Sequence, residues 1–504
     1  MSDYIISLDL GTTSARCIIF DEKAKVVSSA GKELNCYYPR AGWVEQDPAQ
    51  LWDSVLWCMK EAFGKCGLSA SDITAAGITN QRETTLLWDK ETGETIYNAI
   101  VWQCNRGRGY IDALDDDRKK MICEKTGLIP SPYFSASKLA WLLDNVPKAK
   151  EMARSGRLAF GTPDSWLLYK LSGGRVHMTD YTNASRTMLF DIHKLGWDED
   201  LLSFFEIPLC VMPELKPSSG YFVKTDPAIS GAPIPVCGVA GDQQSALFGQ
   251  CCFKAGDVKI TYGTGCFMLM NSGDKPVRSK NGLLTTLTAQ SCENMPVYAT
   301  EGSVFMGGAV ISWLRDNLGI IKTPGETQKL AEEAGSNGGV YIVPAFTGLG
   351  APYWRADATG IITGLTRGTD RRHIVRAALE AICYQCNDVL KAMESDSGMV
   401  LKEIMADGGA VANGLLMQFQ ADIADADVIV PDNTESTALG AFMLAGLGSG
   451  VFKSIDDLTV LVGYDRIFKP GIDGESRERL LKGWKEALDK LLHRSLAGNK
   501  DIII

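Results

Sequence analysis

Long apolar runs are missing from this chain of 504 residues. No run approaches the roughly 18 to 20 residues that a membrane-spanning helix needs, so we expect no integral membrane association. The first residues carry no basic stretch, and Asp9 interrupts the first apolar run, which argues against a secretory signal. The sequence therefore predicts a cytoplasmic protein.

Basic residues are outnumbered by acidic ones. Lys and Arg total 51 against 61 Asp and Glu, which gives a formal net charge of -10. An acidic chain is repelled by the phosphates of nucleic acids and by anionic membrane surfaces, so we expect neither as a partner. A local basic pocket for a smaller anion is compatible with this balance.

Paired cysteine motifs are also missing, although the chain has 14 cysteines. Cys383 and Cys386 have the spacing of one half of a zinc site, but no second ligand pair lies near them in the sequence. Scattered cysteines of this kind are typical of reduced thiols in a cytosolic protein. We therefore expect neither a zinc site nor a disulfide framework.

The first glycine turn matches neither of the common phosphate-loop motifs. A strand from Tyr4 to Leu8 and a second from Arg16 to Phe20 are joined through Gly11, with no GxGxxG and no GxxxxGK[ST] between them. The turn between these strands instead predicts a tight hairpin. The hydroxyls of Thr12, Thr13 and Ser14 and the backbone amides at its tip can face a ligand above it.

Polar residues gather where predicted strands end. A buried strand from Val236 to Ala240 is followed by Gly241 and then by Asp242 and Gln243. The strand from Ile73 to Ile78 runs into a dense polar cluster, Thr79 to Thr85. Such clusters are typical of α/β proteins whose ligands lie at the ends of strands.

The second half of the chain repeats the pattern of the first. A strand from Val258 to Thr261 leads into a turn, Gly263 to Gly265, that is rich in Gly and Thr. A third glycine turn, Asp407 to Asn413, follows a strand and precedes a helix. We place a domain boundary near Gly249 to Gly256, which divides the chain into residues 1–250 and 251–504. We also expect a helix from Gly302 to Leu318.

The order of these three turns resembles the phosphate 1, phosphate 2 and adenosine motifs of the actin-like ATPases. One such turn alone is ordinary, whereas three in this order are much more specific. Within that superfamily, Tyr133 to Leu142 and Gly360 to Gly364 resemble the signatures of the FGGY carbohydrate kinases. Three further segments resemble the family members that phosphorylate glycerol, and the likeness covers nearly the whole chain: Gly77 to Thr85, Asp180 to Met188, and Pro344 to Trp354.

The resemblance implies an α/β fold of two actin-like, ribonuclease H-like ATPase domains with a cleft between them. It implies that the chain phosphorylates glycerol to sn-glycerol 3-phosphate in glycerol catabolism. The reaction would depend on ATP and Mg²⁺. Asp242 would be the general base, and Asp9 and Asp242 would hold the metal. The residues that would bind the alcohol are Arg82, Glu83, Trp102, Tyr133, Asp242, Gln243 and Phe267. Those that would bind the nucleotide are Thr12, Thr13, Ser14, Arg16, Thr264, Gly265, Gly308, Ser312, Gly409 and Asn413.

Other interpretations of these residues stay open at this point. By burial alone, the three aromatic residues of the alcohol set are more often core residues than ligand walls. Arg82 and Glu83 could form an exposed ion pair, and Asp9 could cap its own turn. A kinase for another short polyol or a small ketose fits the family, and so does an actin-like or chaperone-like ATPase without an alcohol substrate.

The resemblance also bears on partners. Family members are often homodimers or homotetramers. In several bacterial relatives, an Arg-bearing loop before the base strand binds fructose 1,6-bisphosphate, but the corresponding Ser230 to Pro235 is shorter and has no Arg. Other bacterial members are activated by phosphorylation of a histidine in the same region, but none of the four histidines lies there. Ser476 stands where relatives have a Glu that binds zinc in the contact with a sugar-transport regulator. The sequence therefore argues against all three forms of regulation.

Overall fold

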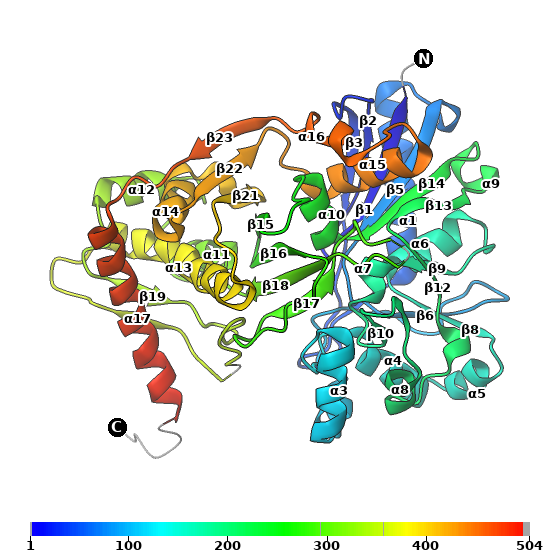
Figure 1. Cartoon of the computed structure of the whole chain (residues 1–504), viewed down its shortest axis with the longest axis horizontal. Coiled ribbons are helices and arrows are strands. Elements are labelled where there is room, and N and C mark those ends of the chain that lie inside the picture. Colours follow the sequence, from blue (N-terminus) through cyan, green and yellow to red (C-terminus); the bar gives the residue numbers. More distant parts are fainter. Residues whose placement is uncertain (1–2, 293, 356, 497–504) are drawn as a thin grey trace.

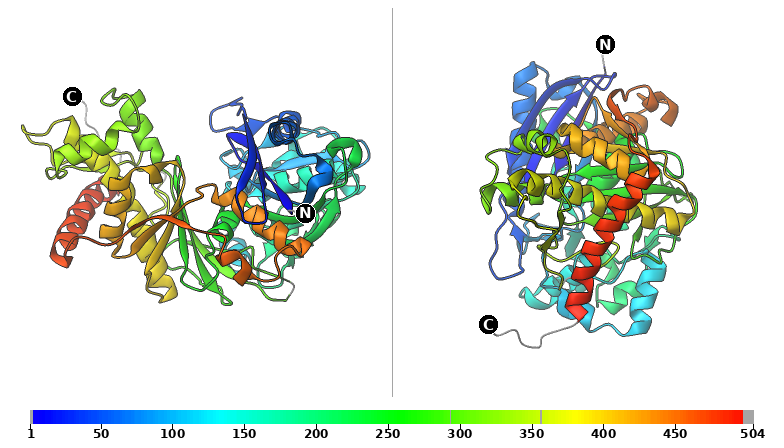
Figure 2. Two further views of the ribbon diagram at one scale, coloured as in Figure 1. Left: turned by 90° about the horizontal axis from the view of Figure 1, so that it is seen from above. Right: turned by 90° about the vertical axis from the view of Figure 1, so that its left-hand side faces the viewer.

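The computed structural model describes residues 3–292, 294–355 and 357–496. The chain forms two lobes, and each is built around a central mixed β-sheet with helices packed against it (Figures 1 and 2). The N-terminal lobe contains the blue and teal segments of Figure 1, and the C-terminal lobe contains most of the yellow and red ones. Within the described residues, no helix is both long and apolar enough to cross a membrane.

The sheet of the N-terminal lobe has six strands in the order β13-β14-β5-β1-β2-β3. The first three strands in sequence form an antiparallel meander, and β5 and β14 continue the sheet parallel to β1. The edge strand β13 is antiparallel to its neighbour. The bounds are β1 (Tyr4–Leu10), β2 (Ser14–Phe20), β3 (Val26–Glu33), β5 (Ile73–Asn80), β13 (Ser219–Lys224) and β14 (Pro235–Gly241).

The sheet of the C-terminal lobe repeats this topology in the order β17-β18-β16-β15-β21-β22-β23. An antiparallel set, β15, β16 and β18, is followed by β21 and β22 parallel to β15, and β23 closes the edge antiparallel. Strand β17 is an addition at the other edge. The bounds are β15 (Val258–Tyr262), β16 (Cys266–Gly273), β17 (Leu284–Leu287), β18 (Tyr298–Val304), β21 (Glu403–Asp407), β22 (Asp427–Pro431) and β23 (Tyr464–Phe468).

Helix α1 begins and ends where local sequence signals place it. Helix α1 has Asp47 as its N-cap, with the side chain accepting a hydrogen bond from the Ala49 amide, and Pro48 in its first turn. It ends at Gly67, which takes the left-handed conformation. The principal helices are α1 (Pro48–Cys66), α4 (Ser135–Asn145), α6 (Pro163–Leu171), α10 (Asp242–Gly249), α11 (Gly308–Asp316), α12 (Glu326–Ala334), α13 (Arg371–Ser397), α14 (Gly414–Ala424), α15 (Ser436–Ser449) and α17 (Gly474–Leu496).

Shorter elements decorate both lobes. Two-stranded pairings join β4 to β7, β6 to β8, β9 to β12, β10 to β11 and β19 to β20. Their bounds are β4 (Glu45–Gln46), β6 (Leu86–Asp89), β7 (Ala99–Ile100), β8 (Leu158–Gly161), β9 (Met178–Asp180), β10 (Phe190–Asp191), β11 (Gly196–Trp197), β12 (Glu214–Lys216), β19 (Tyr341–Val343) and β20 (Ile361–Thr363). The short helices are α2 (Arg108–Asp112), α3 (Asp116–Thr126), α5 (Ala149–Arg154), α7 (Tyr181–Ala184), α8 (Glu199–Phe204), α9 (Pro227–Ser230) and α16 (Ile455–Thr459).

Helix α15 crosses back to the N-terminal lobe. It lies against β1, β5 and β14, where Figure 1 shows it in orange beside the blue strands, and it also packs on α10. The contact is close because both helices carry glycine: a Cβ on Gly440 would overlap the carbonyl of Ser245, and one on Gly249 would overlap the carbonyl of Ser436.

The domain boundary between residues 250 and 251 stays a prediction.

The expected helix from Gly302 to Leu318 is wrong at its beginning. Residues Gly302 to Val304 are the end of strand β18, where Gly302 pairs with Met268 of β16. Helix α11 begins only at Gly308. A short run of small and apolar residues has no period that distinguishes a buried strand from a helix, so pairing within the sheet decides its conformation.

Candidate active site

Arg82 and Glu83 lie in a tight turn directly after β5. The amide of Thr84 donates to the carbonyl of Arg82 at 2.7 Å, and Glu83 has a positive φ of 62°. For a residue with a Cβ, this conformation costs about 1–3 kcal/mol and occurs mainly where surrounding contacts fix it. Both side chains are almost fully buried, with 3% and 1% of their residue surface exposed. An exposed ion pair is therefore excluded.

Two arginines and two glutamates form a buried network beside this turn. Glu301 of β18 binds Arg82 through both oxygens, with distances of 2.7 Å from Nη1 to Oε2 and 2.8 Å from Nη2 to Oε1. Arg186 donates from Nε to Glu83 Oε1 at 2.7 Å and from Nη2 to Glu301 Oε1 at 3.0 Å. Bidentate charged pairs of this kind fix the plane of the guanidinium group.

The charged groups of this network shift one another's pKa. Burial alone would raise the pKa of Glu301, but Arg186 and Arg82 outweigh it and bring that pKa down to about 2. Burial raises the pKa of Glu83, against the opposing effect of the same two arginines. The C-terminal lobe thus supplies, through Glu301, an ionised carboxylate to a cationic cluster of the N-terminal lobe.

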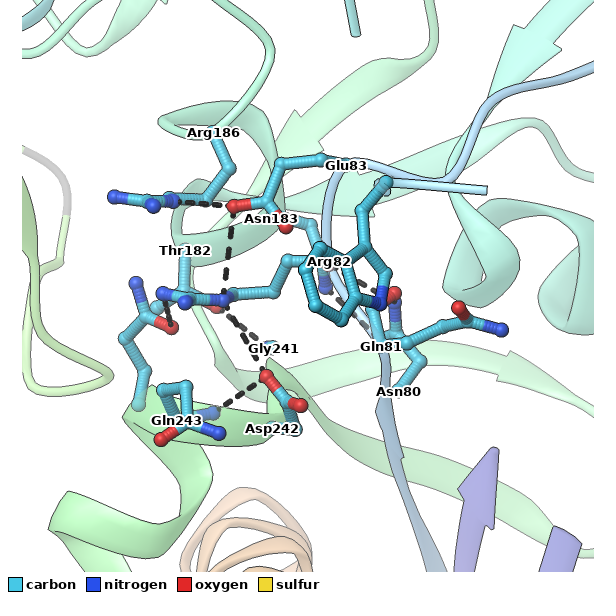
Figure 3. A network of polar contacts seen from close by, with 12 residues as sticks. Asn80, Gln81, Arg82, Glu83, Thr182, Asn183, Arg186, Gly241, Asp242 and Gln243 are labelled. Atoms are coloured by element: carbon cyan, nitrogen blue, oxygen red, sulfur yellow. Dashed lines mark hydrogen bonds and ion pairs between the residues drawn. The ribbon is translucent and has the colours of Figure 1, made fainter. Parts of the chain in front are cut away.

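Asp242 lies at the beginning of α10, next to Arg82 (Figure 3). Its Oδ1 is 3.3 Å from Arg82 Nε and accepts a hydrogen bond from the amide of Gln243 at 2.8 Å. The preceding Gly241 donates its amide to Thr182 Oγ1 at 2.9 Å, which anchors the start of the helix. The side chain of Asp242 is 30% exposed, and no described residue donates to its Oδ2. That oxygen is available to a ligand.

Gln243 is held by a lysine of the other lobe. Lys259 of β15 donates to Gln243 Oε1 at 2.5 Å and to Thr261 Oγ1 at 2.8 Å. The lysine has no exposed surface. Burial lowers its pKa, while Asp407 and Asp242 act in the opposite direction. Each lobe therefore contributes side chains to the same polar cluster.

The predicted aromatic residues are only partly brought together. The ring centroids of Trp102 and Tyr133 lie 5.4 Å apart, and the two ring planes meet at 64°. Both residues are half-buried. Trp102 Nε1 donates to Thr12 Oγ1 at 2.9 Å, which connects the pair to the first glycine turn. The buried ammonium group of Lys138 donates to the backbone carbonyl of Tyr133 and two neighbours. Phe267 is half-buried on β16, and no ring contact among the described residues joins it to the pair.

The first glycine turn has the expected hairpin geometry. Strands β1 and β2 pair antiparallel, and the amide of Gly11 donates to the carbonyl of Ser14 at 3.0 Å. The carbonyl of Thr13 accepts from Leu34 at 2.9 Å, whereas its side chain is exposed. Arg16 forms a half-exposed ion pair with Glu435 at 2.5 Å. The cationic side chain that follows this turn is therefore paired with a residue from the other end of the chain.

The second glycine turn is packed against the beginning of α11. The amide of Gly308 donates to the carbonyl of Gly263 at 2.8 Å, and that of Ala309 donates to Thr264 at 3.0 Å. A Cβ on Gly308 would lie 2.9 Å from the carbonyl oxygen of Gly263, so this approach needs glycine. Gly265 lies in the turn beside these residues, and Ser312 is exposed one turn further along α11.

The third glycine turn contacts the end of β15. Gly408 has a φ of 92°, and a Cβ there would lie 2.5 Å from the carbonyl oxygen of Tyr262. Gly409 follows with its surface exposed, and Asn413 caps α14 by accepting from the amide of Leu416 at 3.1 Å. The second and third turns are thus neighbours, because β15 and β21 are adjacent parallel strands.

Asp9 is suited to a metal ion. Burial raises the pKa of Asp9 to about 7, opposed by Arg16 and reinforced by Asp242 and Glu435. No hydrogen bond to its carboxylate is found in the described part of the chain, so it does not cap its own turn. Asp9 is half-buried by surface area, and a carboxylate without a donor, near a second carboxylate, matches the oxygen ligands that Mg²⁺ prefers.

The sequence is similar to models of one protein family over most of its length. The N-terminal domain model of the FGGY family of carbohydrate kinases matches residues 4–249, and the C-terminal domain model matches residues 258–449. The chain belongs to the FGGY family of carbohydrate kinases. The predicted two-domain α/β fold is thereby confirmed.

Individual FGGY kinases resemble the whole chain. A glycerol kinase of Clostridium botulinum is 54% identical, over 98% of this chain and 99% of its own length. Glycerol kinase 2 of Thermotoga maritima is 52% identical, over 97% and 99%. The crystal structure of Plasmodium falciparum glycerol kinase with ADP superposes with a TM-score of 0.91 at 37% identity, covering 97% of this chain and 98% of that one.

Three residues of this FGGY kinase site did not follow from the sequence. Lys259 is a charged residue inside the predicted apolar strand from Val258 to Thr261, a signal that could have pointed to a buried charge with a partner. Glu301 lies in β18, for which no strand was predicted. Arg186 lies within a segment that resembles the family but was not assigned a role. The roles of the predicted alcohol, nucleotide and metal residues stay predictions.

Proposed function

We propose that this chain phosphorylates glycerol to sn-glycerol 3-phosphate with ATP as donor. The observation that carries the proposal is the cluster of Arg82, Glu83 and Asp242, in which Oδ2 of Asp242 has no partner among the described residues. The likeness to glycerol kinases over nearly the full length supports the same substrate. We further propose that residues 1–250 and 251–504 are the two domains and that ATP binds in a cleft between them.

The alcohol site recognises hydroxyl groups by paired donors and acceptors. Glu83 and Asp242 accept hydrogen bonds, Arg82 and Gln243 donate them, and the aromatic side chains cover the carbon backbone. These aromatic residues are Trp102, Tyr133 and Phe267. An analogue that lacks a hydroxyl leaves a buried polar group unpaired and is rejected for that reason.

Asp242 takes the proton in the proposed reaction. A hydroxyl oxygen of glycerol attacks the γ-phosphorus of ATP, its proton passes to Oδ2 of Asp242, and ADP leaves as the bond to the γ-phosphorus breaks. The residues of the first two glycine turns orient the phosphates, and those of the third turn bind adenosine. When bound, Mg²⁺ neutralises charge on the phosphates. Asp9 and Asp242 would hold it.

Glycerol-dependent release of ADP tests the proposal. We expect the purified chain to release ADP from MgATP only when glycerol is present, as measured with a coupled pyruvate kinase and lactate dehydrogenase assay. Equal rates with and without any alcohol would indicate the actin-like or chaperone-like ATPase instead. A higher kcat/KM for another short polyol or a small ketose would change the substrate but keep the reaction.

Trp102→Phe is expected mainly to weaken the binding of ATP. The ring keeps its apolar cover over the alcohol, but the hydrogen bond from Nε1 to Thr12 is lost. Loss of one neutral hydrogen bond corresponds to about a fivefold change, so we expect KM for ATP to rise about fivefold. Trp57→Phe, at an exposed position of α1, is the matched control. A rise confined to the KM for glycerol would contradict the role of this bond.

The assembly and location of the chain belong to the same proposal. We propose a cytoplasmic homodimer or homotetramer. Fructose 1,6-bisphosphate is not expected to inhibit it, and a zinc-mediated sugar-transport regulator is not expected to bind.

A further inference from the structure

Two charged residues lie in one row across the sheet of the C-terminal lobe. In register, Lys259 of β15 pairs with Leu269 of β16, and Leu269 pairs with Glu301 of β18. Directly paired residues of neighbouring strands project from the same face of a sheet. Neither charged side chain has exposed surface, although a charge is rarely buried without a specific partner.

The partners of this row belong to the N-terminal lobe. Glu301 binds Arg82 and Arg186, Lys259 binds Gln243, and Leu269 packs in one apolar cluster with Leu247 of α10. The helix that carries Asp242 therefore lies over this row. The alcohol site of the N-terminal lobe is completed by side chains of the other sheet.

Glu301 determines which hydrogens of Arg82 remain for a ligand. A guanidinium group has five N–H bonds. Glu301 accepts one from Nη1 and one from Nη2, and Gln244 Oε1 accepts from Nη1 at 3.1 Å. What remains is the Nε–H, which lies 3.3 Å from Asp242 Oδ1, and one hydrogen on Nη2. Rotation of the guanidinium plane would turn the Nε–H away from that carboxylate.

We propose that Glu301 is a positioning residue of the alcohol site, which fixes the guanidinium plane of Arg82 from the opposite lobe. This inference rests on the proposed function, because the alcohol is the ligand that Arg82 binds. Glu301 acts on the substrate only through Arg82 and Arg186. Its loss therefore weakens recognition of the alcohol more than that of ATP.

Glu301→Gln is the test variant. The amide has the same size, but its NH₂ group faces a guanidinium N–H, and the buried arginines lose one neutralising charge. We expect KM for glycerol to rise about 30-fold, as found when one partner of a buried charged pair is removed, with KM for ATP changed less than about twofold. Glu301→Asp keeps the charge but shortens the reach, so its KM for glycerol should lie between those of the wild type and Glu301→Gln.

Glu380→Gln is the matched control. Glu380 is a buried glutamate of the same lobe, paired with Arg376 at 2.5 Å, and it makes no described contact with the alcohol cluster. We expect this variant to lose stability without a change in the KM for glycerol. The comparison separates positioning from folding, since partial unfolding lowers the apparent kcat but leaves the KM of the remaining folded enzyme unchanged.

Each outcome of this experiment bears on one claim. If the wild type shows no alcohol-dependent release of ADP, the proposed function fails and the inference fails with it. If the wild type turns over but Glu301→Gln has the wild-type KM for glycerol, only the inference is overturned. Should Glu301→Gln be insoluble, Glu301→Asp decides: a KM for glycerol above that of the wild type, with the KM for ATP unchanged, supports the inference, and an unchanged KM for glycerol overturns it.

Discussion

Asp242→Asn is expected to lower kcat about 10³-fold, because the amide cannot accept the proton of the attacking hydroxyl. Asn has the same size as Asp, and its carbonyl oxygen can still accept from the Gln243 amide that now donates to Oδ1. The start of α10 should therefore keep its geometry. Nucleotide binding, measured by calorimetry with ADP, should stay within about threefold of the wild type if Asp9 and the three glycine turns supply most of the contacts.

The control for this variant is an Asp to Asn change at another helix start. Asp115 caps α3 by accepting from the Arg118 amide at 2.8 Å, and Asn caps a helix as well as Asp does. Asp115→Asn should therefore retain full activity. A kcat for Asp242→Asn within tenfold of the wild type would remove Asp242 as the general base, and loss of ADP binding would indicate a damaged fold instead.

The regular elements of the sheets could be predicted from the sequence because their signals are local. The hairpin of the first two strands follows from apolar runs on either side of Gly11, and it is present as β1 and β2. The same holds for the strand before Asp242 and for the helix that begins after Asp47. In each case, the residues that determine the element lie within it or next to it.

The contacts of Glu301 could not be predicted in this way. Arg82 and Glu301 are 219 positions apart, and their pairing depends on how two sheets meet. Periodicity places a side chain on one face of its own strand but does not state what covers that face. The family resemblance supplied Arg82, Asp242 and Gln243 as predicted ligand residues. Glu301 binds Arg82 and Lys259 binds Gln243, and neither belongs to that predicted set.

The packing partners of helix α15 could not be predicted from the sequence either. Its sequence, rich in Ala, Gly and Leu, is that of a buried helix, but no local signal in it indicates which sheet it covers. The chain returns from the second sheet to pack it against β5 and β14 of the first. Its position determines that of α10, since Ser245 Oγ of α10 donates to the carbonyl of Thr437 at 2.7 Å.

Gly440→Ala is therefore expected to destabilise the fold and to abolish most activity. The new methyl group would overlap the carbonyl of Ser245, a backbone atom that cannot rotate away, so α10 and α15 must separate. Overpacking of this kind costs about 1–3 kcal/mol or more. Thermal unfolding followed by circular dichroism should show a lower Tm, and the residual kcat should fall because Asp242 lies at the start of the displaced helix.

Gly64→Ala is the matched control in helix α1. A Cβ at Gly64 meets no atom within 4 Å, so the same substitution there should raise stability by about 0.5–1 kcal/mol through helix propensity. Opposite shifts of Tm in the two variants would attribute the loss at Gly440 to the contact between α10 and α15. Equal shifts would contradict it. If Gly440→Ala keeps the wild-type Tm but loses activity, the two helices have separated without unfolding, and the catalytic geometry depends on their spacing more than the stability of the lobe does.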